Sequence, residues 1–539
     1  MKANRAVAQS RKTLSRVSQK AGVRHVMSKA PVASSRKSPA KKAATMGLEA
    51  RRAQLSKYFG ELFSQPWLQE LAADLRQRQP KSNAHMEEIR KMDVSAPGLW
   101  PYFGLMMPVV SERAKGSRLY DIDGNEYIDL FLGYGTSSLH GHNPEPVVQF
   151  MKELMGKSLG NGYSSGIHVE YLRLLKDLVP HRETWAFQES GSAATQGAIR
   201  LARAFSGRRL VVRFEGSING QYDIASHNSL PPFHGHPLLP FPPKKGAEVQ
   251  PQSFNRGTQV LGKEDILILT FNDPRSLDII KKRKHEIACV ITEPIPQFFP
   301  VADKALPFIK ELGDVCKKAG VILILDEVHS GFRFGPSGAT GYANLHADLV
   351  CYGKVMTGLG IPLSAFAGRS DLMALVGTSG SGIQDIGNKA FIATTHNSNH
   401  LAIAASYASL SLLKQKGQAF YDRTRQKVKK MREKLATLDV APDMSLYLYG
   451  SGEFYGGLVF AKQPPHMANS IREFVQSLNP IGAVVLSLLL RRKGVYTHAV
   501  PQFYTGDAHS EEELDTVFGK IRECVAEMKQ NGFNFSTLP

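Results

Sequence analysis

Short runs rich in apolar and β-branched residues alternate with helical segments over residues 185–415. The apolar runs cover residues 210–214, 266–270, 288–292, 321–325 and 365–368, and segments of helical periodicity lie between them at 193–205 and 305–319. Strands that are apolar on both faces are typical of a parallel sheet covered by helices on both sides. The pattern therefore predicts an α/β fold with a large, doubly wound and mostly parallel sheet.

The two ends of the chain have a different pattern, which predicts a second and smaller domain. Residues 49–90 have helical periodicity, and residues 118–130 alternate around Asp123-Gly124, as a hairpin does. After a further helix at 401–414, residues 416–539 mix helices with short strands. We expect a large domain at 126–415 and a small α+β domain formed by both chain ends, that is by the N-terminal segment 49–125 and the C-terminal segment 416–539.

Composition excludes several classes of protein. The chain of 539 residues is 42% hydrophobic and 21% charged, which leaves room for large buried cores. Its longest apolar stretch, residues 481–490, is too short to span a bilayer, so we predict a buried segment and no membrane contact. The four cysteines lie far apart and form no CxxC pair, and the two His-Gly-His pieces lack further ligands. No metal site is predicted.

The positive charge is concentrated in the first 48 residues. This leader holds 12 Lys or Arg residues and no acid, and the rest of the chain carries only +7 of the +19 net charge. Such a segment is typical of an organellar transit peptide, or equally of a solvated arm that touches nucleic acid or anionic surfaces. A cytoplasmic or an organellar matrix location fits these two interpretations. Because the body is nearly balanced in charge, we do not expect nucleic-acid binding to be its main role.

One candidate binding feature is a helix that begins with small residues. The sequence Glu189-Ser190-Gly191-Ser192-Ala193-Ala194 opens the predicted helix, whose inner face would carry Ala194, Ala198, Leu201 and Phe205. Backbone N–H groups and the helix dipole favour an anion such as phosphate at this position. By itself the pattern is equally typical of a plain N-cap.

Two further features lie at the ends of predicted strands. Asp326 follows the apolar run 321–325, and Lys354 follows the apolar run 349–353. Ligands of α/β folds bind at the carboxyl ends of the strands, and a lysine beside a carboxylate there can form a Schiff base. The alternatives are a turn cap for Asp326 and a solvated side chain for Lys354. Together with the anion cradle, the two residues supply the phosphate site, the acid and the amine that pyridoxal 5'-phosphate requires.

Longer motifs around these residues resemble a known family. They read RLYDIDGNEYIDL, GHNPEPV, ESGSAATQGAIRLARAFSGR, ITEP, LILDEVHSGFRFGPSGATGYANLHADLVCYGK and HSEEELD. On these motifs the sequence resembles, over residues 95–530, the class III pyridoxal-phosphate aminotransferases of fold type I. It is most similar to their glutamate-1-semialdehyde 2,1-aminomutase-like branch. The segment from Asp326 to Lys354 is the most specific part.

The resemblance implies roles for residues near the cofactor ring. Lys354 would bind the cofactor aldehyde as a Schiff base, and Asp326 would pair with the ring nitrogen. Val328 would pack on one face of the ring, and His329 would stand near the ring hydroxyl. Glu293 matches the acid of the family's E-P strand end. Lys354 and Asp326 are thus the expected catalytic residues.

The resemblance also implies the phosphate site. The loop Ser190-Gly191-Ser192 would hold the phosphate, although the family pattern S-G-T-E-A carries an acid that this chain lacks. Thr395 is similar to the threonine that reaches the phosphate of a neighbouring subunit. A homodimer with active sites at the interface is therefore implied.

Three departures from the family pattern affect the site. Ile218-Asn219-Gly220 replaces the family's Y-H-G motif, so Ile218 would cover the ring without an aromatic face. Glu189 replaces an asparagine and adds negative charge beside the phosphate. The stretch from residue 97 to residue 108 has no arginine for a substrate carboxylate and offers apolar and aromatic side chains instead. We therefore expect an apolar or bulky substrate.

These observations lead to one function and two alternatives. The predicted activity is transamination, in which an amino group moves between a small-molecule amino donor and a carbonyl acceptor. An aminomutase, which shifts the amino group within one substrate, would use the same residues. The departures at Ile218 and Glu189 also leave open a catalytically impaired relative that serves as a scaffold.

Overall fold

The computed structural model describes residues 48–93, 109–157, 163–229, 241–253, 256–297, 302–450, 455–498 and 502–536. The leader, residues 1–47, and the aromatic stretch at 97–108 lie outside the described residues, so the predictions made for them stay predictions. Among the described residues, no helix combines the length and the apolar character needed to cross a membrane.

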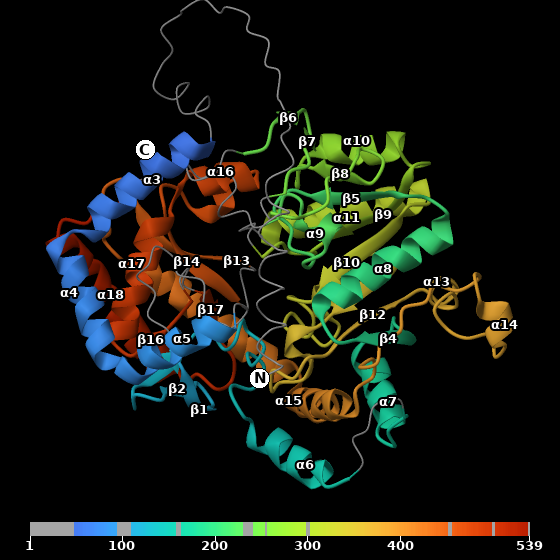
Figure 1. Cartoon of the computed structure of the whole chain (residues 1–539), viewed down its shortest axis with the longest axis horizontal. Coiled ribbons are helices and arrows are strands. Elements are labelled where there is room, and N and C mark those ends of the chain that lie inside the picture. Colours follow the sequence, from blue (N-terminus) through green and yellow to red (C-terminus); the bar gives the residue numbers. More distant parts are fainter. Residues whose placement is uncertain are drawn as a thin grey trace, which may run out of the picture. The chain divides into compact units, whose positions relative to one another are not determined.

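A nine-stranded mixed sheet forms the centre of the larger part (Figure 1). Its strands, in spatial order, are β4 (Thr184–Gln188), β12 (Ser364–Gly368), β11 (Leu349–Tyr352), β10 (Ile322–Glu327), β9 (Ile287–Thr292), β5 (Leu210–Phe214), β8 (Ile266–Leu269), β7 (Glu248–Val249) and β6 (Lys244–Lys245). The five strands from β11 to β8 are parallel, whereas β12, β7 and β6 pair in antiparallel fashion. The predicted strands are confirmed.

Helices cover both faces of this sheet, which confirms the doubly wound arrangement. Alternate strand residues point to opposite faces, so that Val212 and Val290 belong to one apolar core and Val211 and Cys289 to another. The helices of this part are α6 (Glu145–Met155), α7 (His168–Leu178), α8 (Gly191–Ser206), α9 (Asp223–Ser226), α10 (Pro274–Lys282), α11 (Ala302–Ala319), α12 (Gly338–Tyr342), α13 (Ser370–Met373) and α14 (Gly382–Asp385). Helices α7, α10 and α11 pack into the first core, and α8 and α13 into the second.

Segments near both ends of the described chain form the smaller α+β part, as predicted. One sheet has the order β1 (Ser111–Lys115), β2 (Arg118–Asp121), β3 (Glu126–Asp129) and β16 (Val495–Tyr496); a second contains β13 (Ser445–Gly450), β14 (Tyr455–Ala461), β15 (Leu478–Asn479) and β17 (Gln502–Tyr504). The helices are α3 (Leu48–Phe63), α4 (Pro66–Arg78), α5 (Pro80–Met92), α16 (Ile471–Gln476), α17 (Pro480–Arg492) and α18 (Glu511–Gln530). Leu71 of α4, Leu489 of α17 and Ile521 of α18 share one core. The exact domain boundaries stay predictions.

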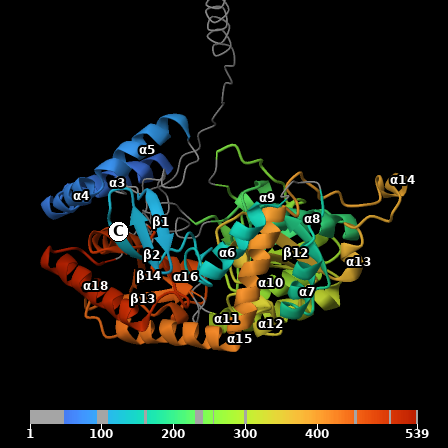
Figure 2. The same ribbon diagram turned by 90° about the horizontal axis from the view of Figure 1, so that it is seen from below.

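Two predictions for single elements are resolved by the structure. The apolar stretch 481–490 is the buried part of α17, as expected. The helix expected at 401–414 continues as α15 (His400–Leu435), because a second helix follows a break at Gly417, where φ is 59° and ψ is −155°. Part of α15 packs on α6 and α7 and part on α18 and β13, so that α15 joins the larger to the smaller part (Figure 2).

Candidate active site

Strand register brings the candidate residues to one edge of the sheet. Leu325 of β10 pairs with Thr292 of β9, and Glu327 pairs with Tyr352 of β11. Asp326, Glu293 and Lys354 therefore lie at the carboxyl ends of three adjacent parallel strands, which is where α/β folds place ligands. The strand β10 extends to Glu327, so Asp326 belongs to the strand and does not follow it as the sequence suggested.

Asp326 is a buried carboxylate with two hydrogen-bond donors. The Asn219 Nδ2 donates to its Oδ2 at 2.9 Å, and the Val328 backbone N–H donates to its Oδ1 at 3.1 Å. Burial raises the pKa of Asp326 to about 6, although the two donors and the nearby charge of Lys354 oppose this rise. The side chain is therefore ionised at neutral pH and holds a negative charge in the interior.

Lys354 begins a short 3₁₀ turn at Lys354–Met356 and has a left-handed backbone, with φ at 47°. Such a conformation is costly for a residue with a Cβ and is often found at functional sites. Burial and the nearby guanidinium of Arg333 lower the pKa of Lys354 to about 8, while Asp326 and Glu293 oppose the shift. At this pKa about a tenth of the amine is uncharged at pH 7 and half at pH 8, and the uncharged form is the nucleophile.

Glu293 holds the loop that carries Ile218. Its Oε1 accepts the Ile218 N–H and its Oε2 accepts the Gln297 N–H, each at 3.0 Å. Burial raises the pKa of Glu293 to about 8. The structure therefore places Glu293 behind the half-buried Ile218 as its backbone anchor.

Arg213 was not singled out by sequence reasoning. It lies in β5 with none of its side chain exposed, and its guanidinium donates to Asn219 Oδ1 (3.2 Å) and to the carbonyls of Ser217 (2.7 Å), Ile224 (3.1 Å) and His227. The feature of the sequence that could have identified Arg213 is its position as a charged residue inside the apolar run LVVRF. A buried charge in such a run must have partners inside the protein.

The N-terminus of α8 forms a narrow cradle beside Val328. A Cβ atom on Gly191 would lie 2.9 Å from Val328 Cγ1, and one on Gly220 would lie 2.9 Å from Ser192 Oγ. Ser190 caps the helix by accepting the Ala193 N–H, and Ser192 Oγ accepts the Gln221 N–H at 3.2 Å. The helix has 16 residues, and two hydroxyl groups lie at its start, on the N-cap Ser190 and on Ser192 in the first turn. Small residues, hydroxyls and a helix N-terminus suit a phosphate, so the residues present fit pyridoxal phosphate.

His329 contacts residues from distant parts of the chain. Its Nε2 lies 2.8 Å from the Tyr504 hydroxyl of β17. The buried guanidinium of Arg333 donates to the His329 carbonyl, to Gly135 O at 2.6 Å and to Ser138 Oγ at 3.1 Å. Burial and Arg333 lower the pKa of His329 well below its usual value. His329 is therefore a neutral ring at working pH.

A strained turn at residues 132–135 lines the same region and was also missed. Leu132, Gly133, Tyr134 and Gly135 all have positive φ values, of 46°, 59°, 57° and 74°. Asp129 holds this turn, since its Oδ1 accepts the N–H groups of Phe131 (2.8 Å) and Leu132 (3.0 Å). Only tertiary contacts stabilise a backbone of this kind.

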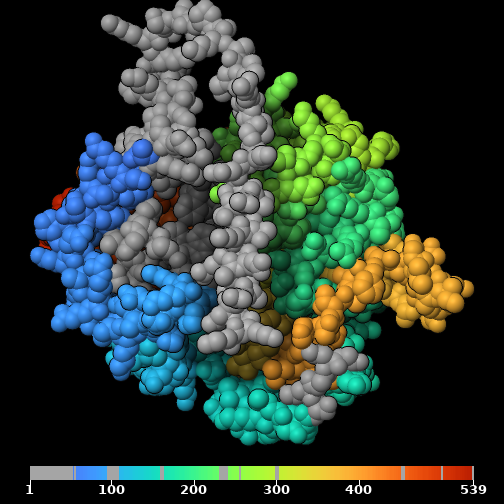
Figure 3. Space-filling model, in the orientation of Figure 1, coloured from blue at the N-terminus to red at the C-terminus, as the bar shows by residue number. Residues whose placement is uncertain are grey.

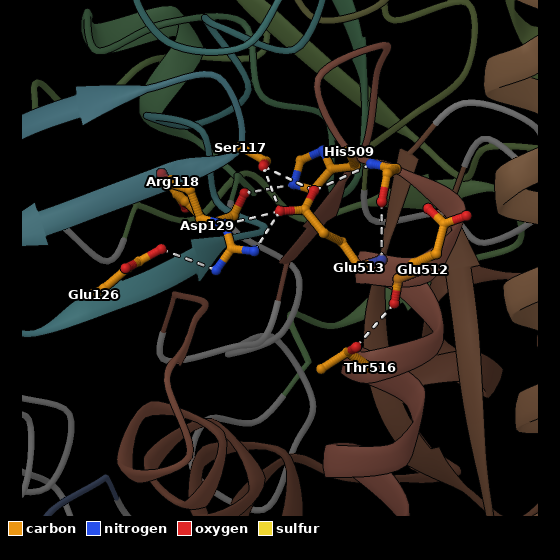
Figure 4. A network of polar contacts seen from close by, with 9 residues as sticks. Ser117, Arg118, Glu126, Asp129, His509, Glu512, Glu513 and Thr516 are labelled. Atoms are coloured by element: carbon orange, nitrogen blue, oxygen red, sulfur yellow. Dashed lines mark hydrogen bonds and ion pairs between the residues drawn. The ribbon is translucent and has the colours of Figure 1, made fainter.

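Asp129 is itself held by the polar network of Figure 4. The His509 ring donates to the Asp129 carbonyl at 3.0 Å, and Glu513 of α18 accepts the Ser117 hydroxyl at 2.9 Å. Glu513 also pairs with Arg118 at 2.6 Å. The network ties the turn to β2, β3 and α18 of the smaller part.

One expectation for a side chain, that for Phe205, is wrong, and one, that for Thr395, stays a prediction. Phe205 does not lie on the inner face of α8. It belongs to the last turn of the helix and is 42% exposed to solvent. Thr395 is exposed, and its expected role at the phosphate of a second subunit stays a prediction. Its neighbour Thr394 donates to Glu189 Oε2 at 3.2 Å, so the loop does reach the strand end that precedes α8.

The family model of the class III aminotransferases matches residues 103–517. The chain belongs to this family. It is 30% identical over 429 residues to a glutamate-1-semialdehyde 2,1-aminomutase of Persephonella marina, which covers 78% of this chain and 92% of that protein. The class III aminotransferase described here is thus a pyridoxal-phosphate-dependent enzyme of the aminotransferase or aminomutase type, as the sequence predicted.

Solved structures share the fold of this aminotransferase. A glutamate-1-semialdehyde aminomutase from Pseudomonas aeruginosa superimposes with a TM-score of 0.72 at 21% identity, covering 89% of this chain and 99% of that one. An omega-transaminase from Sphaerobacter thermophilus also gives 0.72, at 20% identity, covering 84% and 99%. The expected fold type I architecture is confirmed.

Proposed function

We propose that the protein transfers an amino group between an amino donor and a carbonyl acceptor, with Lys354 as the covalent anchor of the cofactor. The observation that carries this proposal is the convergence of Lys354 and Asp326 at adjacent strand ends, beside the α8 cradle. An amine of lowered pKa and a buried carboxylate are the two groups that this chemistry requires of the protein.

The residues divide the chemistry between them. Bound pyridoxal phosphate supplies an aldehyde and a ring that withdraws electrons from the substrate Cα. Asp326, ionised above its pKa of about 6, would stabilise a proton on the ring nitrogen. The Lys354 amine, with a pKa of about 8, would be the base that takes a proton from the substrate Cα and gives it back. Ser190, Gly191 and Ser192 would hold the phosphate, Val328 and Ile218 would cover the ring, His329 would lie near its hydroxyl, and Asn219 would support Asp326.

The site favours an apolar or bulky substrate. Tyr134 is 50% exposed on the strained turn, and its ring contacts Phe131 (4.4 Å between centroids) and His498 (5.5 Å). In the described part of the site, the guanidinium groups of Arg213 and Arg333 bind protein carbonyls. An aromatic wall is thus available to the substrate, and these two cations are already engaged.

The aminomutase reaction is the second candidate, because the curated relative from Persephonella marina carries that name over 78% of this chain. The same Lys354 and Asp326 would serve it. The two functions differ in whether the amino group leaves the substrate molecule. Incubation of the enzyme with glutamate-1-semialdehyde alone separates them, since only an aminomutase isomerises it without a second substrate.

We further infer a homodimer, the arrangement typical of the family. A cavity of about 800 Å³ opens between β4, α7 and the segment around α14, which projects from the surface (Figure 3). Exposed apolar side chains gather beside it, namely Leu172, Ile383, Ile386 and Phe391. An apolar patch of this kind is typical of an interface. Thr395 lies on the same segment, where it could reach a second subunit.

The test is the visible absorption spectrum of the purified protein with added pyridoxal phosphate. We expect an absorption band of the bound cofactor that Lys354→Ala abolishes and that candidate amines bleach. Lys282→Ala, at an exposed lysine of α10, is the matched control and should keep the band. Absence of the band at saturating cofactor would contradict the proposal and favour the interpretation as a catalytically impaired scaffold.

A further inference from the structure

A chain of hydrogen bonds connects the buried cation Arg213 to Asp326 through a single side chain. Arg213 Nε donates to Asn219 Oδ1 at 3.2 Å, and Asn219 Nδ2 donates to Asp326 Oδ2 at 2.9 Å. The amide can have only one orientation here, because Arg213 can only donate and an ionised Asp326 can only accept. Asn219 is therefore polarised from both sides, and each hydrogen bond strengthens the other.

No carboxylate contacts Arg213 directly among its recorded partners. Its other donors bind the carbonyls of Ser217, Ile224 and His227, which are neutral. Burial lowers the pKa of Arg213 to about 10, and the electrostatic partners that favour its charge are Tyr222, Glu293 and Asp326. The positive charge thus acts on the two carboxylates of the site from behind Asn219.

We propose that Arg213 and Asn219 are positioning residues that keep Asp326 ionised and oriented toward the cofactor ring. This inference rests on the proposed function, since it gives Asp326 the same role. Asn219 transmits the charge of Arg213 without itself titrating. An ionisable residue at 219 would exchange protons with Asp326, and its effect on Asp326 would then change with pH.

Other groups around Asp326 do not replace this pair. The titratable or charged groups that interact electrostatically with Asp326 are Arg213, Tyr222, Glu293, Cys351 and Lys354. Glu293, with a pKa raised by burial to about 8, is mostly uncharged at neutral pH and opposes the charge of Asp326 only when it ionises above that value. Lys354 favours the charge only while its own amine is protonated. Arg213 is the one group of this set that stays positive throughout the working pH range.

The test measures binding of pyridoxal phosphate to the apoenzyme as a function of pH, with no assay of activity. Asn219→Asp keeps the shape of the side chain but replaces the donor to Asp326 with a second carboxylate. Two like charges at this distance cannot both ionise freely, so the pKa of Asp326 rises. We expect the acid-side loss of cofactor affinity to move up by about one pH unit or more, with about a tenfold weaker affinity per unit at the acid end.

Two further variants separate the inference from a general effect on folding. In Asn219→His, a neutral imidazole can accept a hydrogen bond from Arg213 and donate one to Asp326. This variant should therefore have the wild-type pH profile above the pKa of the imidazole. Arg213→Lys keeps the charge but loses the Nε–H donor, and it should shift the profile by less than Asn219→Asp. If Arg213→Lys does not fold, the two variants of Asn219 still decide the matter.

Matched controls exist in the same molecule. Arg208 donates to three backbone carbonyls, those of Lys284, Ile287 and Gly320, at the opposite end of β5. Arg208→Lys should leave the pH profile unchanged. Thr195→Val removes the bond from Thr195 Oγ1 to Asn219 O (2.6 Å) without touching the side-chain relay. It should weaken binding equally at every pH.

The outcomes distinguish this inference from the proposed function. A pH profile of Asn219→Asp that coincides with the wild type, while Asp326→Ala abolishes binding, would overturn the inference and leave the function intact. A wild-type protein that binds no cofactor would overturn both. A shift that Asn219→Asp shows, and that Asn219→His does not show above the pKa of the imidazole, would support the relay.

Discussion

Asp129 and His142 lie 2.7 Å apart, from Oδ2 to Nε2, at the base of the strained turn that lines the site. The second carboxylate oxygen of Asp129 accepts the N–H groups of Phe131 and Leu132. One carboxylate thus joins the GHNP segment to the turn, which presents Gly135 O to Arg333. The turn is held by contacts and not by its own backbone preference.

Replacement of Asp129 by alanine should therefore affect both stability and substrate binding. Loss of hydrogen bonds to a charged acceptor costs about 2–3 kcal/mol in the free energy of unfolding, which urea denaturation measures. We also expect a higher KM for the amino donor, because Tyr134 loses its fixed position. Asp123→Ala is the control, since Asp123 likewise accepts two backbone N–H groups, those of Lys81 and Ser82, in the smaller part. An unchanged KM in Asp129→Ala would argue against a role of the turn in binding.

The rate at which the apoenzyme captures pyridoxal phosphate should rise with pH, with a midpoint near the Lys354 pKa of about 8. The uncharged amine is the reacting form, and its share increases as pH passes this value. The native state releases this proton near pH 8 and the unfolded chain only near 10.5, so the free energy of unfolding also rises with pH in this window. Stopped-flow absorbance measures the capture rate, and Lys354→Met should remove the rise in stability. A capture rate independent of pH between 7 and 9 would contradict the assignment.

Asp326→Asn should stabilise the apoenzyme while it abolishes cofactor binding. Burial raises the pKa of Asp326 from 3.8 to about 6, so the native state binds a proton in this range that the unfolded chain does not. Stability conferred by this group is therefore lost as pH rises from 3.8 to 6, and the charge is unfavourable above that. At pH 7.5 we expect a gain of about 1–3 kcal/mol in the free energy of unfolding. A less stable variant would show that hydrogen bonds from Asn219 and Val328 outweigh burial.

Phe391→Asp should convert the proposed homodimer into monomers. Phe391 is 77% exposed and borders the cavity beside β4, so a charge there would be buried without a partner in a dimer. Light scattering after size-exclusion chromatography measures the mass. Val260→Asp is the control, because Val260 is an exposed apolar residue, 92% accessible, that lies outside this patch. A dimer that tolerates Phe391→Asp would place the interface elsewhere.

The ion pair between Glu215 and Arg472 should be important for stability. Both guanidinium contacts with the carboxylate are 2.8 Å, and Glu215 is 3% exposed at the end of β5, while Arg472 comes from α16. Arg472→Ala leaves a buried carboxylate without its partner, which costs about 3–5 kcal/mol. Differential scanning calorimetry should show a large fall in Tm. The double variant Glu215→Gln, Arg472→Met should recover much of it, and an equally low Tm in the double variant would contradict this explanation.

The sequence determined the elements and the chemistry. Local periodicity was sufficient for the buried strands, the hairpin around Asp123-Gly124 and the buried part of α17, because burial on a sheet or a helix imposes a period on the residues themselves. The Asp326–Lys354 segment also carried the family resemblance, since its two chemical groups lie on neighbouring strands of one motif. These inferences needed no knowledge of distant contacts.

Only the tertiary structure decided how the site is supported. Arg213 reaches Asp326 through Asn219, His329 meets Tyr504 from 175 residues away, and Asp129 fixes a turn with four positive φ values. None of these relationships leaves a period in the sequence, because each depends on which segments the fold brings together. The shifted pKa values of Lys354 and Asp326 have the same origin. They arise from burial and from neighbouring charges, and both are properties of the packed interior and not of the local sequence.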